Sequence, residues 1–264
     1  MFHPHGTGYA ARVPFAARQR STLRVVKHRP YPVPPRPWAG GQTWEHLLFA
    51  HWSCDPAAMA RVIPPGLELD LFEGRSWLAI TPFRLHGLRL RSLPSIPGVN
   101  PFLETNVRTY VRRGGRAGIY FFSLDATSRA AVRGARLLND LPYRYARGRI
   151  DVANGLIRYR IERRDRAHGP AQLETSYRPR GPAAEPVAGS LEHFLVERYC
   201  LFALRDTGEI VRTDIHHRPW RIHAAEGEIR HSGLVPAALA PLADPPLLHV
   251  ARRQDVVVWR PVGT

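Results

Sequence analysis

The segment that starts at Glu104 carries the side chains best suited to chemistry. Side chains alternate between two faces along a β-strand, so one face here holds a carboxylate, an amide, a guanidinium and a phenol, from Glu104, Asn106, Arg108 and Tyr110. Together these groups can transfer a proton and bind a small polar ligand. In an ordinary sheet a polar face is exposed to water, and the residues alone favour that interpretation over a pocket.

Other polar groups lie on neighbouring segments. Ser123 ends another expected strand and is a candidate ligand-binding residue, whereas Asp125 is better explained as a turn or cap residue. Adjacent residues of a strand point to opposite faces, so His216 and His217 do not bind one metal ion together. The histidine and cysteine spacings do not match a zinc site, and the sequence has no glycine-rich nucleotide-binding motif. We therefore expect neither a metal nor a cofactor.

The composition is that of a folded protein with an unusual charge. The chain has 264 residues, 44% of them hydrophobic, which is enough for a full core in one large domain or two small ones. No apolar run reaches the roughly 18 residues of a membrane span, so we expect a cytoplasmic protein. The net charge of +16 comes from arginine, since 37 of the 38 basic residues are arginines and the remaining one is Lys27. These arginines are dispersed, which favours solvated positions and leaves nucleic-acid binding a minor alternative.

The sequence divides near residue 41. Residues 1–41 are rich in proline and arginine without apolar periodicity, so we predict an extended or disordered tail. From residue 42 to residue 264, short apolar runs alternate with proline and glycine, which is typical of a β domain with few helices.

The expected elements follow from local patterns. Helices are predicted to begin near Asp55, to cover about residues 128–138, and to begin at Ser190, with apolar residues at helical spacing as far as Tyr199. Asn154-Gly155 predicts a two-residue type I′ turn between two strands. Strands are predicted at 44–52, 76–84, 103–112, 117–124, 148–153, 156–163, 172–178, 209–217, 220–224, 227–231 and 255–260.

Several segments resemble the YqjF-like bacterial family, a domain family of unknown function. They are Phe49-Ala50-His51-Trp52, Ile63-Pro64-Pro65-Gly66-Leu67, the run from Glu104 to Val111, the run from Tyr120 to Asp125, Leu141-Pro142-Tyr143 and His217-Arg218-Pro219-Trp220. The resemblance extends to the acetoacetate-decarboxylase-like superfamily. It implies a mainly β (α+β) protein, a closed antiparallel β-barrel with a few peripheral helices around a small-molecule cavity. Glu104 is similar in position to a pocket glutamate of that fold, so the resemblance favours the pocket interpretation of its strand face.

The sequence differs from that superfamily at the position of the reactive lysine. Acetoacetate decarboxylase carries Pro-Lys-Lys there, and its first lysine forms a Schiff base with a keto acid. Here the element reads Pro142-Tyr143-Arg144, and tyrosine cannot form an imine. The resemblance therefore implies a pocket without the decarboxylase reaction, in which Arg144 could hold a carboxylate or an enolate.

We expect a small-molecule-binding protein whose ligand is a carboxylate or a carbonyl compound; a homo-oligomer is compatible with the sequence. The leading hypothesis is a lyase or another enzyme of carbonyl chemistry without a covalent intermediate, with Glu104, Arg108 and Tyr143 as catalytic residues. Substrate-binding roles are expected for Asn106, Tyr110, Ser123 and Arg144. Glu104 and Arg108 are expected to share a ligand or to pair directly. The alternative is a non-catalytic binding or scaffold protein that retains the cavity.

Overall fold

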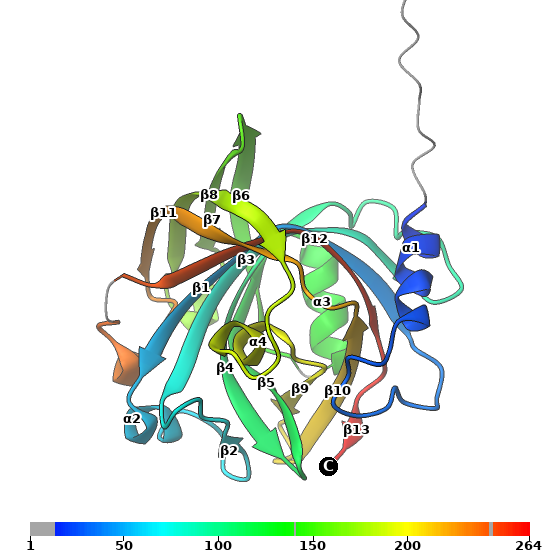
Figure 1. Cartoon of the computed structure of the whole chain (residues 1–264), viewed down its shortest axis with the longest axis horizontal. Coiled ribbons are helices and arrows are strands. Elements are labelled where there is room, and N and C mark those ends of the chain that lie inside the picture. The colour runs from blue at the N-terminus through cyan, green and yellow to red at the C-terminus, as the bar shows by residue number, and fades with distance from the viewer. Residues whose placement is uncertain (1–13, 140, 243–244) are drawn as a thin grey trace, which may run out of the picture.

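The structure is a computed structural model that describes residues 14–139, 141–242 and 245–264, and it consists mainly of β-strands (Figure 1). In this part of the chain the strands are β1 (Gly40–Cys54), β2 (Glu68–Leu69), β3 (Ser76–Leu90), β4 (Phe102–Arg113), β5 (Arg116–Ala126), β6 (Tyr143–Ala153), β7 (Leu156–Arg163), β8 (Gln172–Ala184), β9 (Cys200–Leu204), β10 (Ile210–His217), β11 (Ile222–Ser232), β12 (Leu247–Val258) and β13 (Val262–Gly263). The helices are α1 (Phe15–Ser21), α2 (Pro56–Ala60), α3 (Arg129–Asn139) and α4 (Leu191–Val196), and the 3-10 turns are η1 (Thr22–Arg24), η2 (Arg166–His168) and η3 (Ala237–Leu239).

The strands close into two hydrogen-bonded rings that share a wall. The wall consists of β12, β1, β3, β4 and β5, side by side in this order. In the first ring, which we call ring A, β9 pairs with β5 and β10, and β10 returns to β12. In the second, ring B, the strands β6, β7, β8 and β11 lead from β5 back to β12. Most pairs are antiparallel, as predicted, but β5 runs parallel to both β6 and β9, so the sheet is mixed.

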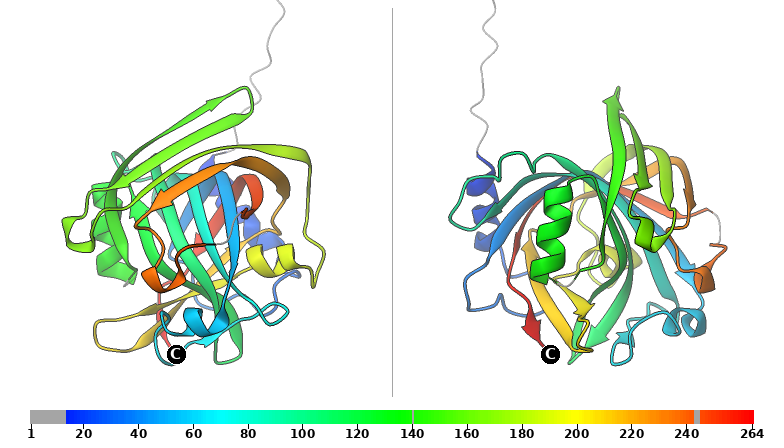
Figure 2. Two further views of the ribbon diagram at one scale, coloured as in Figure 1. Left: turned by 90° about the vertical axis from the view of Figure 1, so that its left-hand side faces the viewer. Right: turned by 180° about the vertical axis from the view of Figure 1, so that it is seen from behind.

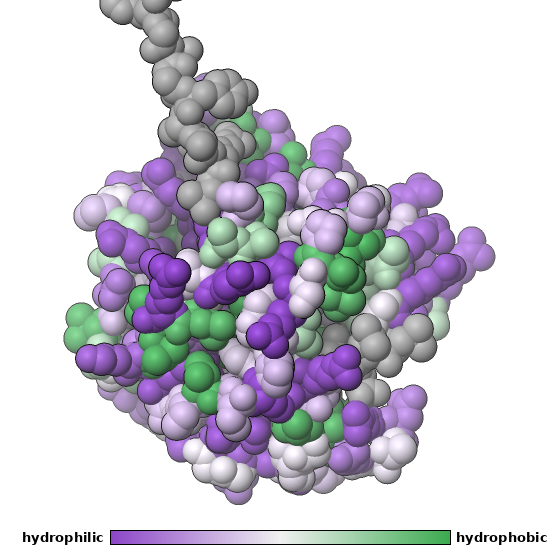
Figure 3. Space-filling model, turned by 90° about the vertical axis from the view of Figure 1, so that its right-hand side faces the viewer, coloured by the Kyte–Doolittle hydropathy of each residue, from purple (hydrophilic) through white to green (hydrophobic). Residues whose placement is uncertain are grey.

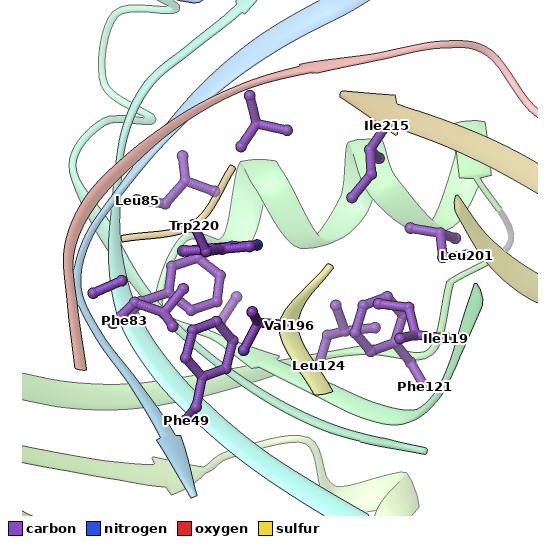
Figure 4. Close-up of a cluster of buried hydrophobic side chains, with 14 of the residues drawn as sticks. Phe49, Phe83, Leu85, Ile119, Phe121, Leu124, Val196, Leu201, Ile215 and Trp220 are labelled. Atoms are coloured by element: carbon purple, nitrogen blue, oxygen red, sulfur yellow. The ribbon is translucent and has the colours of Figure 1, made fainter. Parts of the chain in front are cut away.

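The shared wall is buried on both of its faces. In β4 every residue from Phe102 to Val111 is buried. Tyr110 belongs to a hydrophobic core inside ring A, part of which Figure 4 shows, whereas Val107 belongs to a separate core inside ring B. A strand with one face in water would leave alternate residues exposed. The polar face of β4 is therefore not a solvated face, and that interpretation of the sequence was wrong.

Most of the elements that were predicted from local sequence patterns are present in the structure. Asn154 and Gly155 both have positive φ, 50° and 76°, which confirms the type I′ turn. The hairpin β6–β7 extends well beyond the body of the molecule (Figure 2). Asp55 caps α2 by accepting a hydrogen bond of 2.9 Å from Ala58 N, and Ser190 caps α4 by accepting one of 3.2 Å from His193 N.

Several element predictions need correction. The helix that begins after Ser190 ends at Val196, and the next segment forms β9 within ring A. β9 is a short run of apolar residues without alternation, so periodicity does not distinguish it from a helix. The segments predicted as strands 220–224 and 227–231 form one strand, β11.

Residues 14–39, which we call the N-terminal arm, pack against ring A instead of extending into solvent. The Gln19 side chain in α1 is fully buried, and its amide donates a hydrogen bond of 3.0 Å to Gly87 O. Gly87 has a φ of +58° and lies against Phe15, so a side chain at this position would collide with α1. The tail prediction is therefore wrong for its described part, and residues 1–13 lie outside the described residues. Within the described ranges, no helix is both long and apolar enough to cross a membrane.

Candidate functional site

The polar face of β4 is directed into ring A. Residues that pair across neighbouring strands share one face of a sheet, and Glu104 pairs with Phe83 on β3 and with Ala126 on β5. Both partners belong to the core of ring A. Alternation places Asn106, Arg108 and Tyr110 on the same interior face, as the sequence predicted. All four residues are buried.

Glu104 and Tyr143 meet inside ring A. The Tyr143 hydroxyl donates a hydrogen bond of 2.9 Å to Oε2 of Glu104, which is 4% exposed. Burial raises the pKa of Glu104 to about 7, although hydrogen bonds from Tyr143 and Asn106 oppose the shift. Burial and the adjacent carboxylate hold the pKa of Tyr143 well above its usual range, so the phenol remains the proton donor. A carboxyl group that titrates near neutral pH can both accept and donate a proton.

Arg108 places a buried positive charge on the same face. It is 7% exposed, and its guanidinium lies over the ring of Phe49 at 5.3 Å from the centroid. Its Nη2 donates a long hydrogen bond of 3.5 Å to Leu195 O, and its Nε has no partner in the described part of the chain. None of the ion pairs formed by the described carboxylates includes Arg108. A buried charge without a counter-ion is costly, so this group is suited to an anionic ligand.

Tyr110, on the same strand as Arg108, forms a hydrogen bond with a histidine of β1. The Tyr110 hydroxyl donates to Leu195 O at 2.9 Å, so its oxygen accepts the hydrogen bond of 2.8 Å from Nε2 of His51. Burial and the charge of Arg108 lower the pKa of His51 well below its usual range, which keeps the imidazole neutral. The Nδ1 of His51 is then a buried acceptor, and it has no partner among the described residues.

Further buried polar atoms on this interior face lack a hydrogen-bond partner within the described residues. The set comprises Thr81 Oγ1, Asn106 Oδ1, Arg108 Nε, His51 Nδ1, His249 Nδ1 and the indole Nε1 atoms of Trp77 and Trp220. Buried polar atoms in folded proteins nearly always bond to protein, to water or to a ligand. These atoms are free to form hydrogen bonds with water or with a polar molecule inside ring A.

Two of the predicted substrate-binding residues lie elsewhere. Ser123 pairs with Val107, which belongs to the core of ring B, so the hydroxyl is on the opposite face from Glu104. Arg144 follows Tyr143 on β6 and pairs with Asp125, which places it on that opposite face as well. Asp125 is not merely a turn residue, because it forms a two-point ion pair with Arg163 at 2.7 and 2.8 Å, with both side chains 1% exposed.

Glu104 and Arg108 do not pair directly. Their Cα atoms lie about 13 Å apart along the strand, so a ligand that contacts both side chains must lie between them. Sequence reasoning also missed His51 and His249, which come from β1 and β12 and face the core of ring A near Phe49. His51 alternates with Phe49 in the sequence, and that alternation was the available signal.

Neither a metal cluster nor a lysine occupies this region. The described residues contain no group of three histidine, cysteine, aspartate or glutamate side chains placed to bind a metal ion. Lys27, the single lysine of the chain, is exposed on the N-terminal arm. The interior of ring A therefore holds acid, amide, phenol, imidazole and guanidinium groups but no amine nucleophile.

Solved structures share this fold. Acetoacetate decarboxylase from Legionella pneumophila subsp. pneumophila str. Philadelphia 1 matches with a TM-score of 0.60 at 14% identity, over 90% of this chain and 93% of that chain. An acetoacetate decarboxylase-like enzyme from Sphingomonas wittichii RW1 matches with a TM-score of 0.60 at 15% identity, over 91% and 98%. The enduracididine biosynthesis enzyme MppR, complexed with pyruvate, matches with a TM-score of 0.58 at 13% identity, over 88% and 91%. The protein thus has the acetoacetate decarboxylase-like fold.

Sequence comparison assigns the chain to a family within that fold. Residues 41–255 match DUF2071, described as an uncharacterized conserved protein, and the chain belongs to this family. The uncharacterized protein YqjF of Bacillus subtilis (strain 168) is 41% identical over 229 residues, which cover 86% of this chain and 93% of YqjF. The resemblance inferred from the sequence motifs is thereby confirmed.

Proposed function

We propose that ring A binds a small 2-oxo carboxylate and that Glu104 is the acid–base group acting on it. One observation carries the proposal: a buried carboxyl group with a pKa of about 7 shares an interior face with Arg108, a buried guanidinium that no described carboxylate pairs with. The fold supports a ligand of this class, because MppR was solved with pyruvate.

The chemistry follows from the roles that the side chains can fill. Arg108 binds the ligand carboxylate and offsets charge that develops on the neighbouring carbonyl oxygen. Ionised Glu104 takes a proton from the carbon beside the carbonyl, and the C–H electron pair forms the C=C bond of an enolate. Tyr143 holds Glu104 in position through its hydroxyl, and Asn106 and Tyr110 line the rest of the row. No imine forms, because Lys27 is exposed on the arm.

The test measures binding and proton transfer separately. Pyruvate is incubated with the protein in D2O, methyl deuteration is followed by NMR, and binding is measured by calorimetry. Glu104→Gln should keep pyruvate binding but lower the exchange rate at least about 100-fold. Arg108→Gln should weaken binding itself, because it removes the cation. Ser123→Ala, on the opposite face of the wall, is the control and should alter neither quantity. Equal exchange rates in the wild type and Glu104→Gln would refute the assignment.

A non-catalytic binding protein is the second candidate, and the replacement of the reactive lysine by Tyr143 favours it. This alternative predicts pyruvate binding that depends on Arg108 but no exchange above the rate in buffer. Borohydride treatment should leave the intact mass unchanged under both alternatives, since neither includes an imine.

A further inference from the structure

A second group of cations lies outside ring A, where the N-terminal arm crosses β10. The carboxylate of Asp214 is 1% exposed and has three arginine neighbours. Arg36 Nη2 and Arg212 Nε each lie 3.3 Å from it, and Arg116 Nη1 lies 3.9 Å from it. These arginines come from the arm, from β10 and from the start of β5, so the fold brings together three segments far apart in the sequence.

Arg29 adds a fourth guanidinium to this group. It is 8% exposed and lies over the rings of Tyr199 and Tyr31, at 4.6 and 5.2 Å from their centroids. Arg116 lies over the same Tyr31 ring at 4.4 Å, so one tyrosine contacts two guanidinium groups. Nη1 of Arg29 donates to Ile215 O at 2.8 Å, while its buried Nη2 has no partner within the described ranges.

The group is distinct from the site inside ring A. Asp214 and Ile215 are adjacent on β10, so their side chains point to opposite faces. Ile215 enters the core of ring A, which places Asp214 and Arg212 on the outer face, beneath the arm. The arm runs along this side of the molecule in Figure 1, and Figure 3 shows the same side, where hydrophilic side chains surround smaller hydrophobic areas.

The charges of this group do not balance. Asp214 is the one carboxylate that pairs with these arginines among the described residues, so about three positive charges remain without a counter-ion. Partial burial makes such an excess unfavourable unless an anion shares the site. Guanidinium groups from several directions match the tetrahedral oxygens and double charge of a phosphate group. A single carboxylate ligand would leave part of the charge uncompensated.

We propose that Arg29, Arg36, Arg116 and Arg212 form a binding site for a phosphate group, in which Asp214 keeps the arginines in place. Two of the cations belong to the arm, so the bound phosphate also fastens the arm to the outside of ring A. The phosphate is either free inorganic phosphate or the phosphate of a small organic ester.

Calorimetry on the full chain in 0.15 M NaCl tests the proposal, since at this ionic strength weak attraction between distant surface charges is largely screened. The probes are inorganic phosphate and glycerol 2-phosphate. The wild type should bind at least one of them saturably at one site. Tighter binding of the ester identifies an organic phosphate as the ligand, whereas equal or tighter binding of inorganic phosphate identifies the free ion.

Two variants from different elements assign the binding to this group. Arg36→Gln and Arg116→Gln should each weaken binding at least tenfold, and both side chains are partly exposed, so the fold should tolerate the changes. Arg252→Gln removes the same charge from an exposed position of β12 and should alter the affinity less than twofold. Absence of saturable binding to the wild type, or an equal loss in Arg252→Gln, would overturn the proposal.

Discussion

Replacing Glu104 by glutamine should change how stability depends on pH. Burial raises the pKa of this carboxyl from 4.5 to about 7 in the folded protein. Between these values the folded state keeps the proton that the unfolded state has released, so stability falls as the pH rises. Above the folded-state pKa the carboxyl is ionised in both states, so this group causes no further fall in stability. Glutamine is neutral at every pH and can still accept the hydrogen bond from Tyr143, so the variant lacks this loss.

The size of the effect follows from the shift. A difference of about 2.5 pKa units corresponds to about 3 kcal/mol between the two protonation states. Most of this free-energy difference develops between pH 5 and pH 8. The stability advantage of Glu104→Gln over the wild type should therefore grow by about 2.5 kcal/mol across that range.

Urea unfolding at pH 5, 6, 7 and 8 measures this difference directly. The exposed residue Glu185 supplies the control, because Glu185→Gln should differ from the wild type by a constant amount across the series. Tyr143→Phe provides a second check: it removes a hydrogen bond that stabilises the ionised form, so the pH range of the loss should move upward. A pH-independent difference between Glu104→Gln and the wild type would refute the assignment of a buried carboxyl with a raised pKa.

Two further predictions concern the support of the site. Deleting residues 1–39 should lower the melting temperature by at least about 5 °C more than deleting residues 1–13, because the arm carries the buried Gln19; equal melting temperatures for the two deletions would contradict the packing of the arm. Arg163→Met should cost about 3 kcal/mol by leaving the Asp125 carboxylate unpaired, and Asp125→Asn in the same chain should recover part of that loss. Additive losses in urea unfolding would show that the ion pair is not coupled.

Sequence patterns were sufficient for the elements that depend on neighbours in the chain. The turn at Asn154-Gly155, the caps at Asp55 and Ser190, and the alternation along β4 are all local signals. The motif resemblance added the family and the fold. It also implied that Glu104 and Tyr143 belong to one pocket, and in the structure a hydrogen bond of 2.9 Å joins their side chains.

The remaining features depend on contacts that no local pattern encodes. His249 reaches the interior face through pairing of β12 with β1, about two hundred residues away in the sequence. The arm has the composition of a tail, yet one buried amide, that of Gln19, connects it to Gly87. Arg144 was assigned to the pocket by adjacency to Tyr143, although adjacent strand residues point to opposite faces.

The two faces of β4 have different surroundings, because one face lies in ring A and the other in ring B. On the side of ring B, Thr105 Oγ1 bonds to Tyr159 OH at 3.0 Å, and Val107 packs in an apolar core. These contacts hold the ring B face of the strand in place. On the side of ring A, the same strand presents Glu104 and Arg108 among polar atoms that lack protein partners. A strand held on one face can keep costly polar groups in place on the other, which is what a preorganised site requires. Ring B therefore supports the strand whose other face forms the polar interior of ring A. A sheet with that face in water could not maintain such an interior.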